Sequence, residues 1–218
     1  MKIQPSLFGE FEKQHTILPD ADVLYLPGWF STQANSRTFF KKLKKDISWE
    51  QSEIMLYGKM MKIPRLSAWY GDADSSYAYL GTEFKPLSWL PLLLDIKQAV
   101  ERVLFQHLKG TLFNSALINC YRDGQDSVAW HSDDEPELGK NPAIASLSFG
   151  AEREFQLKHR YNKQYGIHRL ILGDGDLLFM YGAMQHHWYH QIPKSKKDVG
   201  ERINITFRHV YPKNFSFL

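Results

Sequence analysis

The second half of the chain alternates apolar and polar residues in short runs, the pattern that is typical of β-strands with one buried face. From Thr111 onward these runs are separated by turn residues rather than by helical stretches. The predicted strands are Phe113–Tyr121, Ala143–Phe149, Glu154–Lys158, His168–Ile171, Asp176–Tyr181, His186–Ile192 and Arg202–Val210. Short strands at this spacing predict an antiparallel sandwich or barrel.

The first half has a different periodicity. Thr32–Asp46 repeats apolar residues at helical spacing, with Ser31 as its expected N-cap and a lysine-rich face that we interpret as solvated. Ser88–Leu108 predicts a second helix that ends near Gly110. The sequence therefore predicts an α+β protein, mainly β, whose helices precede most of its strands.

The remaining segments of the first half are shorter. Val23–Trp29 predicts an apolar strand, and Trp49–Glu83 mixes short strands with turns. Residues 1–20 read as a flexible tail, and residues 21–218 as a single domain. With 218 residues and 43% hydrophobic composition, the chain is long enough for one core but short for two.

Composition adds little about function. The net charge of +3 permits an anionic partner without indicating one. Cys120 is the single cysteine, which excludes an internal disulfide and fits a reducing compartment. Neither a signal peptide nor a membrane-length apolar run is recognisable. We expect a soluble monomer without membrane contact, in the cytoplasm of a bacterium or the nucleus of a eukaryote.

A His-x-Asp pattern, His131 and Asp133, predicts a metal site, because residues two apart in an extended chain point the same way. The third ligand would come from His186, His187 or His190, and spacing does not choose among them. Two imidazoles and one carboxylate leave coordination positions for a chelating co-substrate and dioxygen. The alternative is a surface turn, since two further acidic residues follow.

The segment after Glu201 predicts an unusual strand. Its apolar residues would face the core, and its polar residues would share the other face: Arg202, Asn204, Thr206 and Arg208. Two guanidinium groups on one face suit a small dicarboxylate. Asn119 and Tyr121 form a similar pair on an earlier strand. The alternatives are an exposed edge strand with scattered arginines and a structural pair.

Taken in order, these motifs resemble the AlkB family of Fe(II)- and 2-oxoglutarate-dependent dioxygenases, and within it the branch of the second human homologue. The ending Arg-x-Asn-x-Thr-Phe-Arg, residues 202–208, is the most specific part. The resemblance implies a double-stranded β-helix, or jelly roll, over about residues 111–210, with a nucleotide-recognition region at about residues 50–85. It also implies oxidative dealkylation of alkylated bases in DNA, such as 1-methyladenine and 3-methylcytosine, with release of succinate, carbon dioxide and an aldehyde.

The same resemblance implies roles for individual residues. Fe(II) would be held by His131, Asp133 and His190, and dioxygen would be consumed. The 2-oxoglutarate co-substrate would be bound by Asn119, Tyr121, Arg202, Asn204, Thr206 and Arg208. The flipped base and the surrounding DNA would be contacted by Tyr57, Gly58, Lys59, Arg65, Tyr77, Tyr79, Asp134 and Glu135. In this scheme Tyr57 fills the gap left by the flipped base.

Gln4–Phe8 resembles the short peptide with which bacterial proteins dock on the replication sliding clamp, so a clamp is an expected partner.

Oxidation that depends on Fe(II) and 2-oxoglutarate would also serve an RNA or protein demethylase or hydroxylase. A non-enzymatic jelly-roll binding module is the alternative outside enzymology, and iron-dependent succinate formation discriminates it from an enzyme.

Overall fold

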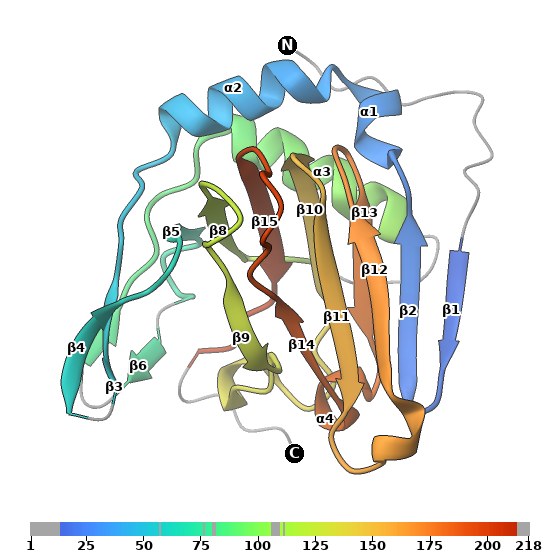
Figure 1. Ribbon diagram of the computed structural model, residues 1–218. Coiled ribbons are helices and arrows are strands. Elements are labelled where there is room, and N and C mark those ends of the chain that lie inside the picture. The colour runs from blue at the N-terminus through green and yellow to red at the C-terminus, as the bar shows by residue number, and fades with distance from the viewer. Residues whose placement is uncertain are drawn as a thin grey trace.

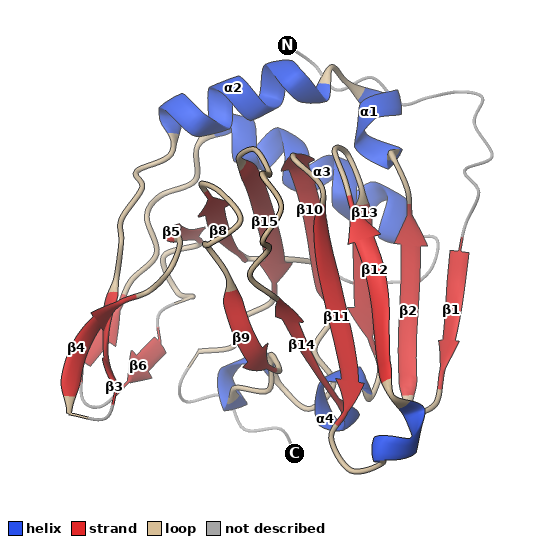
Figure 2. Cartoon of the chain, in the orientation of Figure 1, coloured by secondary structure: helices blue, strands red, loops and turns tan. Residues whose placement is uncertain are grey.

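The computed structural model describes residues 14–56, 58–75, 77–79, 82–105, 110 and 112–212. Two β-sheets face each other, and helices cover the outer face of the larger sheet (Figures 1 and 2). Gln4–Phe8, the expected clamp-binding peptide, lies outside the described residues. The prediction of a mainly antiparallel β protein with helices near its N-terminus is confirmed.

The larger sheet has seven strands, and every neighbouring pair is antiparallel. Its order is β1 (Gln14–Leu18), β2 (Ala21–Leu26), β13 (Leu177–Tyr181), β10 (Ile144–Gly150), β15 (Arg202–Arg208), β8 (Ser115–Tyr121) and β5 (Leu66–Gly71). The arginine-bearing strand β15 lies in the interior of this sheet, between β10 and β8. The alternative of an exposed edge strand is therefore wrong.

The smaller sheet has four strands, in the order β12 (Ile167–Leu172), β11 (Arg153–His159), β14 (Trp188–Ile192) and β9 (Val128–His131). Two separate hairpins complete the strands: β3 (Glu53–Leu56) with β4 (Lys59–Lys62), and β6 (Tyr77–Tyr79) with β7 (Thr82–Phe84). The β3–β4 hairpin extends away from the body of the protein (Figure 1). Two short 3-10 turns are present, η1 (Pro136–Leu138) and η2 (Lys163–Tyr165).

The helices are α1 (Trp29–Gln33), α2 (Ser36–Asp46), α3 (Pro91–Leu104) and the short α4 (Met184–His187). Apolar side chains of α2 and α3 pack against one face of the seven-stranded sheet and form the main core, which includes Phe39, Ile96, Cys120, Ile205 and Phe207. Burying such residues removes apolar surface from water, which is the dominant favourable term in folding. The apolar face expected for β15 is therefore in the core.

A second apolar cluster fills part of the space between the two sheets. It includes Tyr121, Ile144, Leu157, Met180 and Trp188. The remaining space between the sheets is bordered by buried polar side chains, among them Asn119, Asp133, Ser148, His190, Arg202 and Asn204. A row of buried polar groups is costly unless each group is paired, so this part of the interior is the place to look for a ligand.

Three predicted elements differ from the structure. Residues 14–18, expected in a flexible tail, form β1 and pair with β2. The helix expected over Thr32–Asp46 is two helices, and Asn35, not Ser31, caps α2 by accepting a hydrogen bond from the Thr38 N–H. His186 and His187, expected in a strand, belong to α4. Among the described residues, no helix is long and apolar enough to span a membrane.

Candidate active site

Three side chains that could bind a metal ion meet at the edge of the smaller sheet that is formed by β9 and β14. His131 ends β9, Asp133 follows two residues later, and His190 lies opposite His131 on the paired strand β14. Their potential ligand atoms all lie within 4.8 Å of one another. Of the three histidines that spacing left open, the structure brings His190 to this group, whereas His186 and His187 lie in α4.

Both imidazoles present a nitrogen suited to a metal ion. The Nδ1 atom of His131 lies 2.9 Å from the Ala129 carbonyl oxygen. A carbonyl only accepts, so Nδ1 donates and Nε2 remains free for a metal, as in most histidine metal sites. Burial, helped by the charge of His131, lowers the pKa of His190 to about 3, so this ring is neutral at physiological pH. Neutral imidazole is the form that binds metals.

Asp133 is buried and held from two sides. Its Oδ1 atom accepts a hydrogen bond of 2.5 Å from Arg208, and its backbone N–H donates to the Gln185 side chain at 3.0 Å. Burial acts to raise the pKa of Asp133, but the charges of Arg208 and the two histidines outweigh it and lower the pKa. The carboxylate is therefore ionised, and its Oδ2 atom lies 3.9 Å from His190 Nε2.

Gln185 is a residue that the sequence analysis missed. It is fully buried, and its amide oxygen fixes the backbone of Asp133. We expect Gln185→Leu to weaken Fe(II) binding by about 10- to 100-fold, the range found when groups that orient metal ligands are removed. Isothermal titration with Fe(II) under anaerobic conditions measures this. Gln191→Leu, on the outer side of β14, is the matched control, and equal affinities for the two variants would contradict the role of Gln185.

The polar face of β15 borders the space between the sheets. Arg202 pairs in register with Tyr121, and Asn204 with Asn119, so the four residues lie side by side on adjacent strands. Arg202 is 1% exposed and donates from Nη2 to the Ser148 hydroxyl, 2.9 Å away. Its Nε and Nη1 atoms have no hydrogen-bond partner within the described structure. Burial lowers the pKa of Arg202 to about 10, which still leaves it charged at neutral pH.

A buried guanidinium with two unpartnered nitrogens fits an anionic ligand, because charge-assisted bonds to a carboxylate would satisfy both nitrogens. Arg208, at the other end of β15, also has a buried Nε atom without a partner in the described part of the chain. These residues therefore fit an acid with a carboxylate at each end. The same strand thus supplies an anion site and, through Arg208, a contact to the metal-ligating Asp133.

The other residues that were predicted to bind 2-oxoglutarate also form hydrogen bonds with groups of the protein. Asn204 donates to Ser146 and to the Leu147 carbonyl, and it accepts a hydrogen bond from Thr206. Asn119 accepts a hydrogen bond of 2.9 Å from Arg65. Arg65, expected at the rim as a substrate contact, thus points to the co-substrate side of the interior. Its other observed bond is to the Ser127 carbonyl.

A cavity of about 620 Å³ is lined in part by Arg208, the residue that bonds the metal-ligating Asp133. It is bordered by Trp69 of β5, Leu117 of β8, Arg208 and Glu135, among other residues. Burial raises the pKa of Glu135, which lines this cavity, and the charge of nearby Asp133 acts in the same direction, against that of Arg208. Trp69 was not predicted as a site residue, because an aromatic residue on a strand is normally core packing. A planar ligand would find an indole and a carboxyl group here.

Asp134, which was predicted to contact substrate beside Glu135, is directed elsewhere. Its carboxylate forms an ion pair of 2.8 Å with Arg160. Arg160 also stacks over the Tyr189 ring, and Lys158 lies over Trp130, 4.3 Å from the ring centre. Asp134 therefore belongs to a row of charged and aromatic side chains that joins β9, β11 and β14.

The predicted substrate hairpin is present, but only part of it is described. Tyr57 lies outside the described residues, and for Tyr77 and Tyr79 only the backbone of β6 is described. Gly58, at the β3–β4 turn, has φ +75°, and Lys59 is exposed. Four apolar side chains of this hairpin are exposed on both of its faces: Ile54, Met55, Met60 and Met61. Such a surface marks an interaction site.

Comparisons with known proteins bear directly on this site. The model of the 2OG-Fe(II) oxygenase superfamily matches residues 22–208. The chain is 40% identical over 197 residues to the bovine alpha-ketoglutarate-dependent dioxygenase alkB homolog 3, covering 87% of this chain and 66% of that protein. It is 36% identical over 187 residues to the human DNA oxidative demethylase ALKBH2, covering 82% of this chain and 70% of that protein.

A solved structure supports the fold. The structure titled OsALKBH1 superposes with a TM-score of 0.56 at 16% sequence identity, covering 90% of this chain and 99% of that one. Together with the family match, this confirms the jelly-roll prediction. The chain spans about three fifths to two thirds of the length of the alkB homolog 3 proteins that it matches.

Proposed function

Because the chain belongs to the AlkB family of 2OG-Fe(II) oxygenases, we propose that it is an Fe(II)- and 2-oxoglutarate-dependent dioxygenase that dealkylates nucleic-acid bases. The observation that carries the proposal is the buried guanidinium of Arg202, with two unpartnered nitrogens, on the strand whose other end, Arg208, bonds Asp133 of the group His131, Asp133 and His190. An anion site and a two-histidine, one-carboxylate metal site in one interior are what a keto-acid co-substrate requires.

Each residue has a defined task in this reaction. His131, Asp133 and His190 would hold Fe(II), which when bound supplies the activation of dioxygen that the protein cannot supply by itself. Arg202 binds the distal carboxylate of 2-oxoglutarate, and Tyr121 borders the same pocket. Arg208 keeps Asp133 ionised and oriented. Because the low pKa of His190 keeps its ring neutral, this residue can bind the metal ion and does not act as a proton donor.

The substrate side is supported by the cavity and by the relatives. A cavity of about 620 Å³ accepts a planar base, with Trp69 as a surface for stacking and Glu135 as a hydrogen-bonding partner for its polar edge. ALKBH2, one of the relatives, is named as a DNA oxidative demethylase. We extend this to the chain itself, with DNA carrying 1-methyladenine or 3-methylcytosine as the first substrates to test and methylated RNA as the second.

A single assay tests the proposal. The full chain is incubated with Fe(II), 2-oxoglutarate and oxygen, and with DNA and RNA oligonucleotides that carry 1-methyladenine, 3-methylcytosine or etheno adducts, in single- and double-stranded form. Mass spectrometry then follows succinate and the restored base. We expect both products in equal amounts on at least one nucleic acid. Succinate formed only with a methylated protein would contradict the proposal that nucleic acid is the substrate. Absence of succinate despite bound iron would favour a binding module.

The exposed β3–β4 hairpin leads to a prediction about strand form. Replacing Met55 and Met60 by serine removes exposed apolar surface that would contact the duplex next to the flipped base, worth roughly 1 kcal/mol per residue. We expect about tenfold or greater loss of turnover on duplex substrate and little change on single strands. Ile171→Ser, at an equally exposed apolar residue of β12, is the control. Equal losses on both strand forms would show that the hairpin does not act on the duplex.

A further inference from the structure

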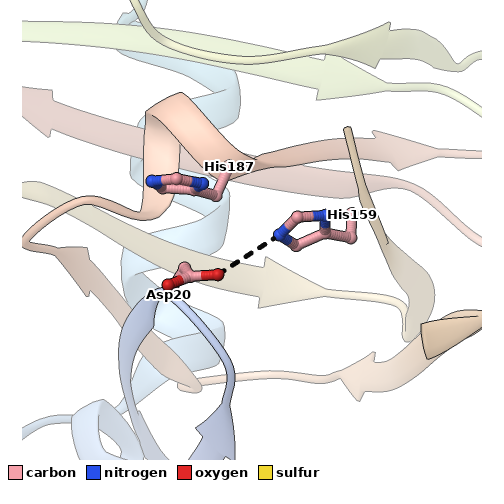
Figure 3. A group of neighbouring side chains, drawn as sticks. All are labelled: Asp20, His159 and His187. Carbon is pink, nitrogen blue, oxygen red and sulfur yellow. Dashed lines mark ion pairs between the residues drawn. The ribbon is translucent and has the colours of Figure 1, made fainter. Parts of the chain in front are cut away.

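Two groups of ionisable side chains lie outside the active site, and they differ in whether the protein itself provides partners for them. Asp20, His159 and His187 come together from the β1–β2 turn, β11 and α4 (Figure 3). His159 Nδ1 accepts hydrogen bonds from two backbone N–H groups, so the neutral ring carries its proton on Nε2, 3.6 Å from Asp20 Oδ2. This group therefore links the two sheets. The second group is a row of cationic side chains on α2, and no described carboxylate pairs with it.

Helix α2 carries a concentration of positive charge that the rest of the chain lacks. Five of its 11 residues are cationic: Arg37, Lys41, Lys42, Lys44 and Lys45. Asp46 is its one carboxylate, so the helix has a net charge of +4. The whole chain has +3, and the residues outside α2 therefore carry a net charge of −1. Charge of one sign gathered on one element indicates an anionic partner for that element.

Arg37, Lys41 and Lys45 form the row on the exposed side of α2. Positions four apart share one face of an α-helix, and each step advances about 6 Å along the axis. The buried residues Phe39 and Leu43 lie on the opposite face of the helix, and all three cations are exposed. The row therefore presents three positive charges to solvent at regular intervals.

The other two lysines of α2 each have a carboxylate near them. Lys44 forms an ion pair with Glu201. Lys42 and Asp46 are one helical turn apart, and both line a cavity of about 380 Å³ between α2 and the start of α3. The arrangement of acidic residues around α2 thus compensates its flanks and leaves the outward row uncompensated.

The row acts against the stability of the helix that carries it. Like charges four residues apart repel each other, and the row contains two such pairs. Arg37 lies in the first turn, where the helix dipole favours acidic side chains, and α2 has none there. Only Lys45, in the last turn, is favoured by the dipole. An anion bound along the row would relieve both effects.

The apolar side of α2 decides which polyanion fits. Helices that bind lipid surfaces bury their apolar face at the boundary of the acyl chains. Here that face is already occupied, because Phe39 and Leu43 belong to the main core. The helix therefore offers charge without an apolar anchor, which suits the phosphates of a nucleic acid, since lysine and arginine contact them without reading sequence.

We propose that Arg37, Lys41 and Lys45 bind phosphates of the nucleic acid that flank the nucleotide in the substrate cavity, a choice of partner that rests on the proposed function. Helix α2 ends at Asp46, and Ser48, two residues later, lines that cavity. The row thus leads away from the cavity along the outside of the molecule (Figure 1). It gives the protein a second contact with a long strand, separate from the β3–β4 hairpin.

The salt dependence of binding tests the row directly. Fluorescence anisotropy of the full chain with labelled, unmodified duplex DNA is measured over a series of salt concentrations. For Arg37→Gln/Lys41→Gln/Lys45→Gln, we expect the slope of log affinity against log salt to become shallower by about 2.7, since each lost phosphate contact accounts for about 0.9. Glutamine keeps the helix propensity of lysine and arginine, so thermal unfolding should show a variant at least as stable as the parent chain.

Two single variants of neighbouring lysines provide the matched control. Lys41→Gln, within the row, should lower the slope by about 0.9, whereas Lys42→Gln, beside Asp46, should keep the slope of the parent chain. The inference is overturned if the triple variant has the slope of the parent chain. It is equally overturned if the triple variant loses only binding to vesicles that contain phosphatidylserine, which would assign the row to a membrane.

Turnover separates this inference from the proposed function. On a long oligonucleotide that carries 1-methyladenine, the triple variant should have a raised KM and an unchanged kcat. On a methylated trinucleotide, which is too short to reach along α2, both constants should match those of the parent chain. If the parent chain dealkylates no nucleic acid, the proposed function fails, and the salt slopes still decide whether the row binds phosphates. Equal losses on the long and short substrates would contradict the flanking position of the row.

Discussion

A His131→Ala variant is expected to form no succinate above the iron-free background, a loss of more than about 100-fold. Groups that merely orient a metal ligand contribute about 10- to 100-fold, and a ligand itself must contribute more. His131 is the right residue to change because its side chain makes one described hydrogen bond, to the Ala129 carbonyl, so its removal leaves the buried Asp133–Arg208 pair intact. Succinate is measured by mass spectrometry, with Fe(II) and 2-oxoglutarate in excess.

The matched control for this variant is His168→Ala on β12, which removes an imidazole from the smaller sheet away from the iron ligands. It should retain turnover close to that of the parent chain. Thermal unfolding of both variants without metal tests whether each is folded. Full turnover by His131→Ala would show that the iron lies elsewhere.

An Arg202→Met variant should lose 2-oxoglutarate binding and yet gain stability as the free protein. Two charge-assisted hydrogen bonds to a carboxylate are worth about 1.5–3 kcal/mol each, so we expect affinity to fall by at least about 100-fold. The free protein, in contrast, carries a fully buried guanidinium whose Nε and Nη1 are unpartnered in the described structure. Replacing a poorly compensated buried charge by an apolar chain of similar length is often stabilising by about 1–4 kcal/mol.

Two measurements separate these effects. Tryptophan fluorescence or calorimetry gives the affinity for 2-oxoglutarate, and denaturant unfolding without ligand gives the free energy of unfolding. The parent chain should gain about 2.7 kcal/mol of stability at a ligand concentration of 100 times its dissociation constant, and Arg202→Met should gain none. Arg153→Met is the control, because Arg153 is also buried but donates to three backbone carbonyls. That variant should be destabilised. A stable, ligand-binding Arg202→Met variant would refute the anion site.

Strand β15 shows what a sequence pattern can predict. Its alternation of arginine, asparagine and threonine with isoleucine and phenylalanine indicates two faces of opposite character, and the structure places the apolar face in the core. Its interior position in the sheet was not predictable, because its neighbours β10 and β8 come from distant parts of the chain. Local pattern determines the faces of a strand, whereas tertiary pairing determines its neighbours.

The errors have equally specific causes. β1 gains its stability by pairing with β2, so the five residues Gln14–Leu18 carry a weak signal of their own. The cap at Asn35 was a readable signal, since asparagine favours this position, but the apolar periodicity across Ala34 concealed the break between α1 and α2. The contact of Arg65 with Asn119 joins residues that are 54 positions apart, and no local pattern contains it.

The buried position of Cys120 has a chemical consequence for a protein with this proposed function. Electrophiles that methylate bases also attack thiolates, and a thiolate is far more nucleophilic than a thiol. Burial raises the pKa of Cys120, and its side chain is wholly enclosed within the main core. The chain contains no other cysteine. The agents that create its proposed substrates would therefore find no accessible sulfhydryl on this chain, and the proposed repair activity would persist while the damage is being inflicted.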